Sequence, residues 1–129
     1  WCSPYADGII EDFISGHGVA NIYRSVSEKE ASSLDVFRLA EQGDQEALTT
    51  WESFGRHLAV PLAWTINLID PETVILGGSI AAAYRYFGPA MEAQLRQNIC
   101  PVPAKQTRVV LSMQGDNAGF VGAACLMLE

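Results

Sequence analysis

A chain of 129 residues, of which 49% are hydrophobic, is long enough for one modest domain, or a large piece of one, with a real core. Its formal net charge of −7, with only 8 Lys and Arg, provides no basic stripe to neutralise phosphates. This argues against nucleic acid or an anionic membrane as the main partner. No run of about 18 apolar residues occurs, so no membrane-spanning helix is predicted.

The cysteines and the first residues predict the cellular context. Cys2, Cys100 and Cys125 are odd in number and far apart, which fits a reducing cytosol better than a disulfide framework. The start of the chain lacks the basic and apolar regions of a secretory signal. Because the chain begins at Trp1, without an initiator Met and in what reads as a loop, we expect a fragment.

Three helices are predicted in the first half. The first covers residues 9 to about 25 and is interrupted or recapped at Gly16-His17-Gly18. Ser33 is expected to cap a short helix over residues 34–41. Gly43-Asp44 should end that helix and cap the next one.

The longest predicted helix runs from about Gln45 to Ile69. It carries one buried stripe, formed by Trp51, Gly55, Leu58, Leu62, Ile66 and Ile69. From Leu58 onward it is apolar nearly all round, so its second half should be central to the domain. Pro61 should kink this helix, or else divide it into two helices, the second with Pro61 in its first turn.

The segment after this helix is the most informative of the chain. Asp70-Pro71 stops the helix, and Val74-Ile75-Leu76 is an apolar run typical of a strand covered on both faces. Gly77-Gly78 follows where the strand, over residues 73–76, ends. Ligands collect at this end of strands in open α/β sheets, where two glycines let a flat ring or ribose approach the backbone. A tight turn that needs positive φ is the alternative.

The remaining elements alternate. Residues 84–99 read as an amphipathic helix, residues 101–103 as a stiff Pro-Val-Pro link, residues 108–113 as a second strand and residues 117–128 as a closing helix. Two strands around a helix imply a parallel or mixed α/β sheet. Two strands are too few to close a core, so further strands must come from elsewhere.

Three segments, in this order and spacing, resemble the C-terminal part of the ROK family of sugar kinases and sugar-responsive repressors. They are Gly8 to Gly16, Ile66 to Gly78 and Asp116 to Ala124. The resemblance implies a two-lobed, ribonuclease-H-like (actin-like ATPase) fold, of which residues 1–129 form most of the C-terminal lobe, helix-rich and with only part of the sheet.

The resemblance also indicates what lies outside this chain. The phosphate-binding loop, the Asp that acts as general base on the sugar hydroxyl, and the Gly-His that contacts sugar and metal would all precede Trp1. We therefore expect no catalytic residue in this chain and no phosphoryl transfer by the chain alone.

Glu11 matches the family Glu that accepts hydrogen bonds from sugar hydroxyls. A carboxylate near a helix N-terminus is held ionised and offers several acceptor positions to a polyol. A plain helix-start carboxylate is the alternative. Asp12 has no such match and is expected to be solvated.

Many family members carry a zinc site of one His and three Cys just before this Glu. Cys2 stands at the first Cys position, but Pro4 and Ile9 stand at the others. One thiolate cannot build a closed four-ligand site, so we expect no metal ligand here and no structural zinc. Tyr5, Asp7 and the surrounding loop are expected to fix Glu11 instead.

Gly77 and Gly78 match the nucleotide-side Gly-Gly of the family, which implies contact with adenosine of ATP, with Ser79 close to the base or ribose. Asp116, Asn117 and Gly119 are expected to cap and pack the last helix rather than line the pocket.

The histidines and tryptophans are expected to be structural. His17 should be exposed, and His57 should serve structure on the long helix. Trp51 and Trp64 should be core or interface residues.

These features predict the C-terminal lobe of a cytoplasmic, ATP-dependent, glucokinase-like hexose kinase, with Mg²⁺ bound to the nucleotide and a homodimer formed through this lobe. The effector-binding part of a ROK repressor and a pure dimerisation module are the alternatives. A glycine-rich phosphate loop before this chain would favour the kinase, and a helix-turn-helix the repressor.

Overall fold

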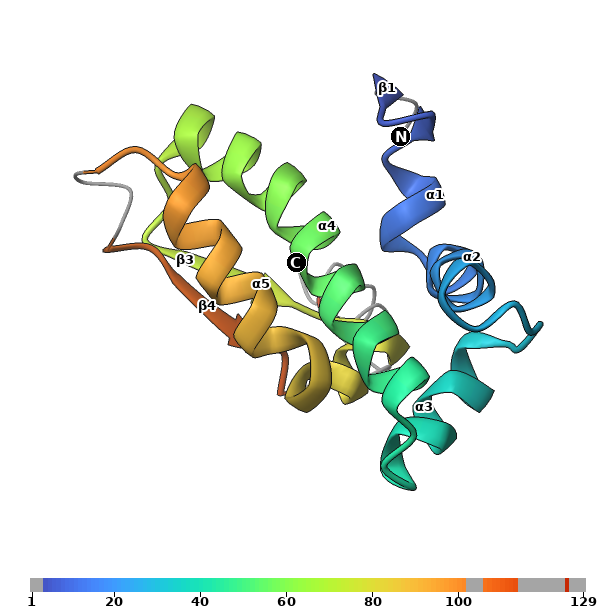
Figure 1. Ribbon diagram of the computed structural model, residues 1–129. Helices are drawn as coiled ribbons and strands as arrows, with labels where there is room; N and C mark the ends of the chain where they lie inside the picture. The colour runs from blue at the N-terminus through green and yellow to red at the C-terminus, as the bar shows by residue number, and fades with distance from the viewer. Residues whose placement is uncertain (1–3, 102–105, 114–124, 126–129) are drawn as a thin grey trace.

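The computed structural model describes residues 4–101, 106–113 and 125. A two-stranded antiparallel hairpin, β1 (Pro4–Tyr5) and β2 (Gly8–Ile9), leads into α1 (Glu11–Ile14), α2 (Gly16–Ser27), α3 (Ser33–Glu41) and α4 (Gln45–Ile69). β3 (Thr73–Leu76), the 3₁₀ helix η1 (Ser79–Ala83), α5 (Tyr84–Asn98) and β4 (Arg108–Leu111) follow. In Figure 1, α4 lies between two groups of elements: β1, α1, α2 and α3 on one side, and β3, β4 and α5 on the other.

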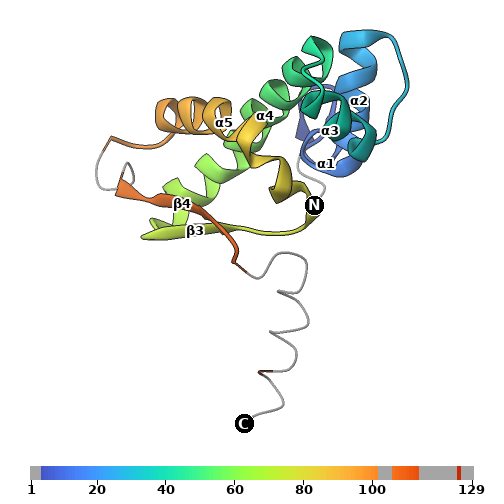
Figure 2. The same ribbon diagram turned by 90° about the horizontal axis from the view of Figure 1, so that it is seen from below.

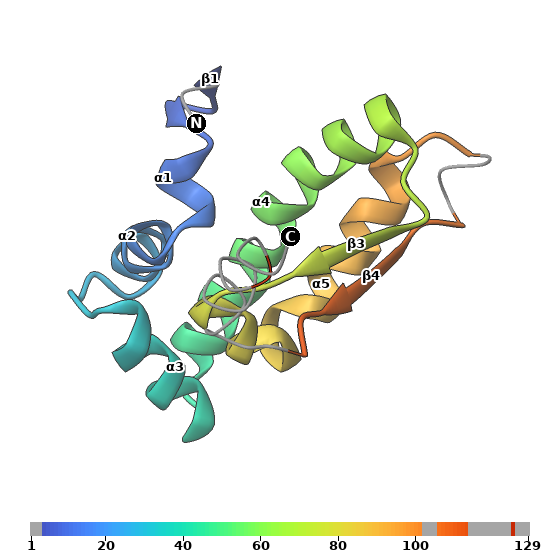
Figure 3. The same cartoon turned by 180° about the vertical axis from the view of Figure 1, so that it is seen from behind.

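β3 and β4 form a parallel pair, in register from Thr73 opposite Arg108 to Leu76 opposite Leu111. Both α4 and α5 lie on the same side of this sheet (Figures 2 and 3). Val74, Leu76 and Val109 pack on the core from the covered face, whereas Ile75 on the other face is 67% exposed. The expected strand covered on both faces is therefore wrong within the described residues, because helices lie against one face only.

The core is built around α4 and α5. Trp51, Phe54 and Phe87 are almost completely buried, with ring centroids 5.3–6.2 Å apart. Gly55 lies directly against the carbonyl of Phe87, where a Cβ would collide with backbone, so this glycine permits the close approach of the two helices. Burial of such aromatic surface contributes several kcal/mol per side chain on the ordinary scale of about 25 cal/mol per Å².

α4 has the bounds that the sequence predicts. Asp44 caps its N-terminus by accepting a hydrogen bond from the amide of Ala47 at 2.8 Å, and Asp70 ends it in the left-handed region at φ 50°. The helix is continuous through Pro61, so the division into two helices is wrong. Its expected central position holds for Ala59, Ala63 and Ile66, which are buried.

One face of the C-terminal half of α4 is nevertheless open. Trp64, Leu68 and Ile69 are 44%, 86% and 66% exposed. α5 and the sheet cover only the opposite side of the helix, so these apolar side chains have no cover among the described residues.

The helix predicted over residues 9 to about 25, with a break or cap change at Gly16-His17-Gly18, is confirmed in part, since α2 begins at Gly16. The hairpin occupies its start, and the break falls at Ser15, whose side chain caps α2 by accepting from the amide of Gly18 at 3.1 Å. α3 is likewise capped one residue earlier than expected, by Ser32 in a capping box with Asp35. The predicted helix over residues 117–128 lies, apart from Cys125, outside the described residues.

Candidate functional site

Glu11 is the first residue of α1 and is exposed. Ile10 before it is completely buried, and Asp12 after it accepts a hydrogen bond from the amide of Ile9 at 2.9 Å. The expectation of a solvated Asp12 is therefore wrong. These neighbours fix the backbone on both sides of Glu11, so the carboxylate projects from a defined position.

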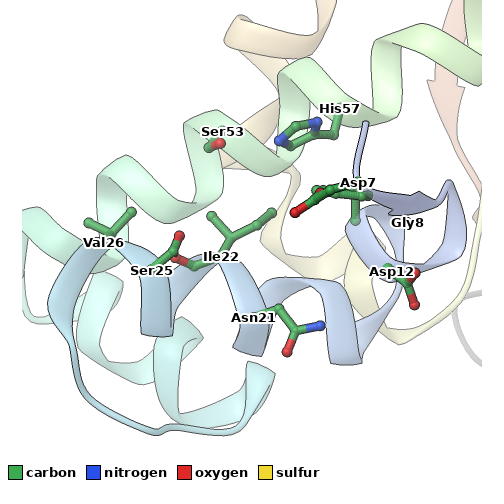
Figure 4. A pocket seen from close by; sticks show the side chains of 10 residues that line it. Asp7, Gly8, Asp12, Asn21, Ile22, Ser25, Val26, Ser53 and His57 are labelled. Atoms are coloured by element: carbon green, nitrogen blue, oxygen red, sulfur yellow. The ribbon is translucent and has the colours of Figure 1, made fainter. Parts of the chain in front are cut away.

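A hollow of about 480 Å³ lies beside this segment, between the hairpin, α1, α2 and α4 (Figure 4). Its lining is mixed apolar and polar and consists of Asp7, Gly8, Asp12, Phe13, Asn21, Ile22, Ser25, Val26, Ser53 and His57.

His57 and Tyr5 form the principal long-range polar contact of the hairpin. The Tyr5 hydroxyl lies 2.8 Å from His57 Nδ1, although 52 residues separate the two in sequence. Burial raises the pKa of Tyr5, and burial together with the charge of Arg56 lowers the pKa of His57 below its ordinary 6.5. Both side chains are thus neutral near pH 7, and we assign the hydroxyl as donor to an unprotonated Nδ1.

Gly77 and Gly78 lie at the carboxyl end of β3, and both are exposed. Gly78 has φ 88° and ψ 171°, a region that only glycine populates readily. A Cβ built on Gly78 meets nothing within 4 Å, and one on Gly77 meets only the Ser112 Cβ at 3.6 Å. The backbone at this pair is therefore open, and the turn alternative also holds, since Gly78 needs its positive φ.

An apolar cavity of about 160 Å³ extends from Gly77 toward the core. Its lining includes Ile14, Leu58 and Phe87. Ile14 is the last residue of α1, and Glu11 is the first. One helical turn, about 5 Å along α1, therefore separates Glu11 from Ile14, which shares the lining of this cavity with Gly77, a residue 66 positions after Glu11 in the sequence.

Ser79 begins η1 and is exposed. It lines a second cavity of about 300 Å³ together with Ser33, Trp51 and Ile80. The three residues predicted to contact nucleotide thus lie along one turn, next to two cavities.

The other candidates fall into three groups. His17 is exposed, and Trp51 is a core residue, both as expected. His57 contacts Tyr5 and Phe13, which no local sequence signal indicates. Asp116, Asn117 and Gly119 lie outside the described residues.

The residues at the zinc positions do not suit a metal. Pro4 and Ile9 pair with each other across the hairpin and carry no ligand atoms. Among residues 4–101, 106–113 and 125, no group of three or more His, Cys, Asp or Glu side chains could hold a metal ion. In the same part of the chain, no helix is both long and apolar enough to cross a bilayer.

A family model described as "ROK family" matches residues 2–129. The chain belongs to the ROK family. It is 31% identical to the N-acetyl-D-glucosamine kinase of Escherichia coli O9:H4 (strain HS), an alignment that covers 98% of this chain and 41% of the relative. The chain therefore spans about two fifths of the length of the curated relatives it matches.

Solved structures agree on the fold. A ROK family glucokinase from Streptomyces griseus, in complex with glucose and AMPPNP, superposes with a TM-score of 0.75 at 21% identity, over 94% of this chain and 45% of that one. A ROK family transcriptional regulator, described as a homologue of the E. coli MLC protein, superposes with a TM-score of 0.70 at 25% identity, over 81% and 29%. The expected actin-like ATPase lobe, helix-rich with a partial sheet, is confirmed.

Proposed function

We propose that this chain is the C-terminal lobe of an ATP-dependent hexose kinase, which transfers the γ-phosphoryl group of ATP to a hydroxyl of glucose or a related hexose. The phosphate-binding loop and the general base belong to the part of the protein that precedes these residues. This chain supplies ligand contacts rather than catalytic residues.

The observation that carries the proposal is that α1 connects Glu11 to the cavity at Gly77. Glu11 opens α1, and Ile14 at the other end of α1 lines the cavity that begins at Gly77. A kinase must place the γ-phosphate beside the sugar hydroxyl, with the adenosine a triphosphate chain away, so one contact for the sugar and a separate one for adenosine on the same lobe suit this reaction.

Each contact has a defined chemical part. The Glu11 carboxylate accepts hydrogen bonds from sugar hydroxyls and so orients the sugar. The open backbone of Gly77-Gly78 receives adenosine, with Ser79 beside the base or ribose. Mg²⁺ bound to the nucleotide would supply positive charge for the transferred phosphoryl group.

The relatives support this assignment. The similarity to an N-acetyl-D-glucosamine kinase covers nearly the whole chain, and the glucokinase of similar fold was solved with glucose and AMPPNP. The test is the variant Glu11→Gln in the full-length protein, assayed with a panel of hexoses and ATP. Loss of charge-assisted hydrogen bonds should lower kcat/KM for the preferred sugar about 10- to 100-fold.

Glu30→Gln is the matched control, because Glu30 is also a carboxylate and its side chain is 87% exposed. It should leave kcat/KM unchanged. An unaltered kcat/KM in Glu11→Gln, with an active parent protein, would remove Glu11 from the sugar site.

The sugar-binding part of a ROK repressor is the second candidate, favoured by the similarity in fold to the ROK regulator. Such a protein would bind a hexose through the same Glu11 but would neither bind nor consume ATP. Sugar titration of the full-length protein with and without ATP distinguishes the two functions.

We further propose that the full-length protein is cytoplasmic, does not bind nucleic acid or membranes, and forms a homodimer through this lobe. The open apolar side chains of Leu68 and Ile69 support the dimer, because association would remove them from water. Light scattering should give twice the chain mass for the parent protein. The double variant Leu68→Lys/Ile69→Lys should give the mass of one chain.

A further inference from the structure

The hairpin before Glu11 lacks the donor atoms of the metal site that the family resemblance implies. At two of the cysteine positions stand Pro4 and Ile9, which face each other across the antiparallel hairpin. Neither side chain carries a ligand atom, and a closed zinc site needs four. Something other than a metal must therefore fix the hairpin.

Three aromatic rings, each from a different element, fix the hairpin. We call Tyr5 of β1, Phe13 of α1 and His57 of α4 the aromatic clamp. Its ring centroids lie 5.1 Å apart for Tyr5 and Phe13, 4.9 Å for Phe13 and His57, and 5.6 Å for Tyr5 and His57. The 2.8 Å hydrogen bond between the Tyr5 hydroxyl and His57 Nδ1 adds direction to this packing.

The clamp connects the hairpin to α4, a helix that forms part of the core. His57 lies on α4, between Phe54 and Ala59, both of which are buried in the core. Tyr5 thus holds the hairpin against a helix of 25 residues, while Phe13 holds α1 against the same helix. Glu11 is on the chain between these two points of attachment.

A hydrogen bond within the segment between Tyr5 and Phe13 restrains its backbone further. The amide of Ile9 donates to Asp12 Oδ2 at 2.9 Å, so the backbone turns around Ile10 and Glu11. Gly8 leaves space for this carboxylate, because a Cβ there would lie 2.6 Å from the same oxygen. The position of the Glu11 backbone is therefore determined from both sides.

We propose that the aromatic clamp positions Glu11 for the sugar without a metal, with Tyr5, Phe13 and His57 as positioning residues. The proposal rests on the proposed function, since it gives Glu11 its role in sugar binding. In this proposal, His57 helps to position Glu11 and does not only stabilise α4.

The test uses the full-length protein with Tyr5→Phe, which removes only the hydroxyl, and His57→Leu, which removes the ring nitrogens. Each should raise the sugar KM about three- to tenfold, the equivalent of one net hydrogen bond, and leave the ATP KM unchanged. His57→Gln, which retains polar groups, should restore part of the loss. Tyr86→Phe on α5 is the matched control and should have no effect.

A double variant separates positioning from general stability. In a Glu11→Gln background, Tyr5→Phe should have no further effect on sugar KM, because the clamp acts through Glu11. An equal loss in both backgrounds would overturn the proposal. Stoichiometric zinc in the purified protein, found by elemental analysis, would also overturn it.

Hydrogen exchange of the peptide over residues 4–12 distinguishes failure of this proposal from failure of the proposed function. Faster exchange in Tyr5→Phe and His57→Leu, together with no sugar binding by the parent protein, would reject the sugar-kinase function but keep the clamp as a fixing device. Unchanged exchange with normal sugar binding would reject the clamp alone.

Discussion

The segment before Glu11 and the segment after β3 each hold a proposed ligand contact just after a short strand, but their backbones are fixed in different ways. Around Glu11, side chains from distant elements determine the backbone: Tyr5 is held by His57, 52 residues away. Around Gly77, the backbone is determined by the ladder to β4 and by the φ of 88° at Gly78. The first depends on side-chain contacts and the second on backbone pairing and backbone conformation, so different substitutions should disrupt them.

The largest effect is expected at Gly78. In Gly78→Ala, an alanine would have to adopt φ +88°, a backbone conformation that costs about 1–3 kcal/mol for a residue with a side chain. The added Cβ would also occupy the open space proposed for adenosine. The ATP KM should rise about tenfold or more, with the sugar KM little changed. Steady-state kinetics at saturating sugar measures this.

Gly77→Ala is the control for backbone strain, since its Cβ would meet only the Ser112 Cβ at an ordinary 3.6 Å. It should raise the ATP KM less and leave the thermal midpoint unchanged. If both variants raise sugar KM as strongly as ATP KM, the two segments are not separate contacts.

The difference between the two segments also explains what could be predicted from sequence. The strand over residues 73–76 and the helix over residues 45–69 have their predicted bounds, because Asp44, Asp70-Pro71 and the apolar run carry strong local signals. The hairpin was not predicted, because its two-residue strands are too short for a periodic pattern.

The aromatic clamp could not be predicted for a related reason. The sequence indicated that Tyr5 and its loop would fix Glu11, but not that His57 would be their partner. His57 occupies one face of an amphipathic helix where a polar residue is unremarkable. Its role depends on how the hairpin packs on α4, which local pattern does not determine.

The next largest effect is expected for Gly8→Ala, in the segment before Glu11, where side-chain contacts hold the backbone. The new Cβ displaces Asp12 Oδ2 from the amide of Ile9, which loses a hydrogen bond worth about 1 kcal/mol. Amide exchange over residues 4–12 should accelerate and the sugar KM should rise. Asp12→Ala should have a similar effect, and the double variant should be no worse than either one, since both remove the same bond.

The clamp should also make the hairpin sensitive to acid. The pKa of His57 is lowered in the folded protein, so protonation favours the unfolded state, and stability falls as the pH drops from about 6.5 through the folded pKa. Arg56 adds to this effect, and Asp7 and Asp12 are the carboxylates that line the same hollow as His57. The protection of the amides over residues 4–12, after correction for the intrinsic pH dependence of exchange, should therefore decrease from pH 7 to pH 5.

His57→Gln supplies the comparison for this pH dependence, because Gln does not titrate. Its exchange rates, corrected for the intrinsic effect of pH, should be flat over the same range. An equal slope in parent and variant would assign the acid sensitivity to the carboxylates rather than to His57.

The smallest expected effect concerns Ala6, which joins the hairpin strands with φ 50°. An L-residue in the left-handed region costs about 1 kcal/mol, whereas glycine has no such penalty but loses more entropy on folding. Ala6→Gly should therefore slow amide exchange over residues 4–12 slightly, corresponding to a gain of about 0.5 kcal/mol. Ala20→Gly within α2 is the matched control and should destabilise its helix by about 1 kcal/mol. If Ala6→Gly instead accelerates exchange as Ala20→Gly does in its own helix, the hairpin does not adopt this turn, and the side chains of the clamp would have to fix Glu11 without it.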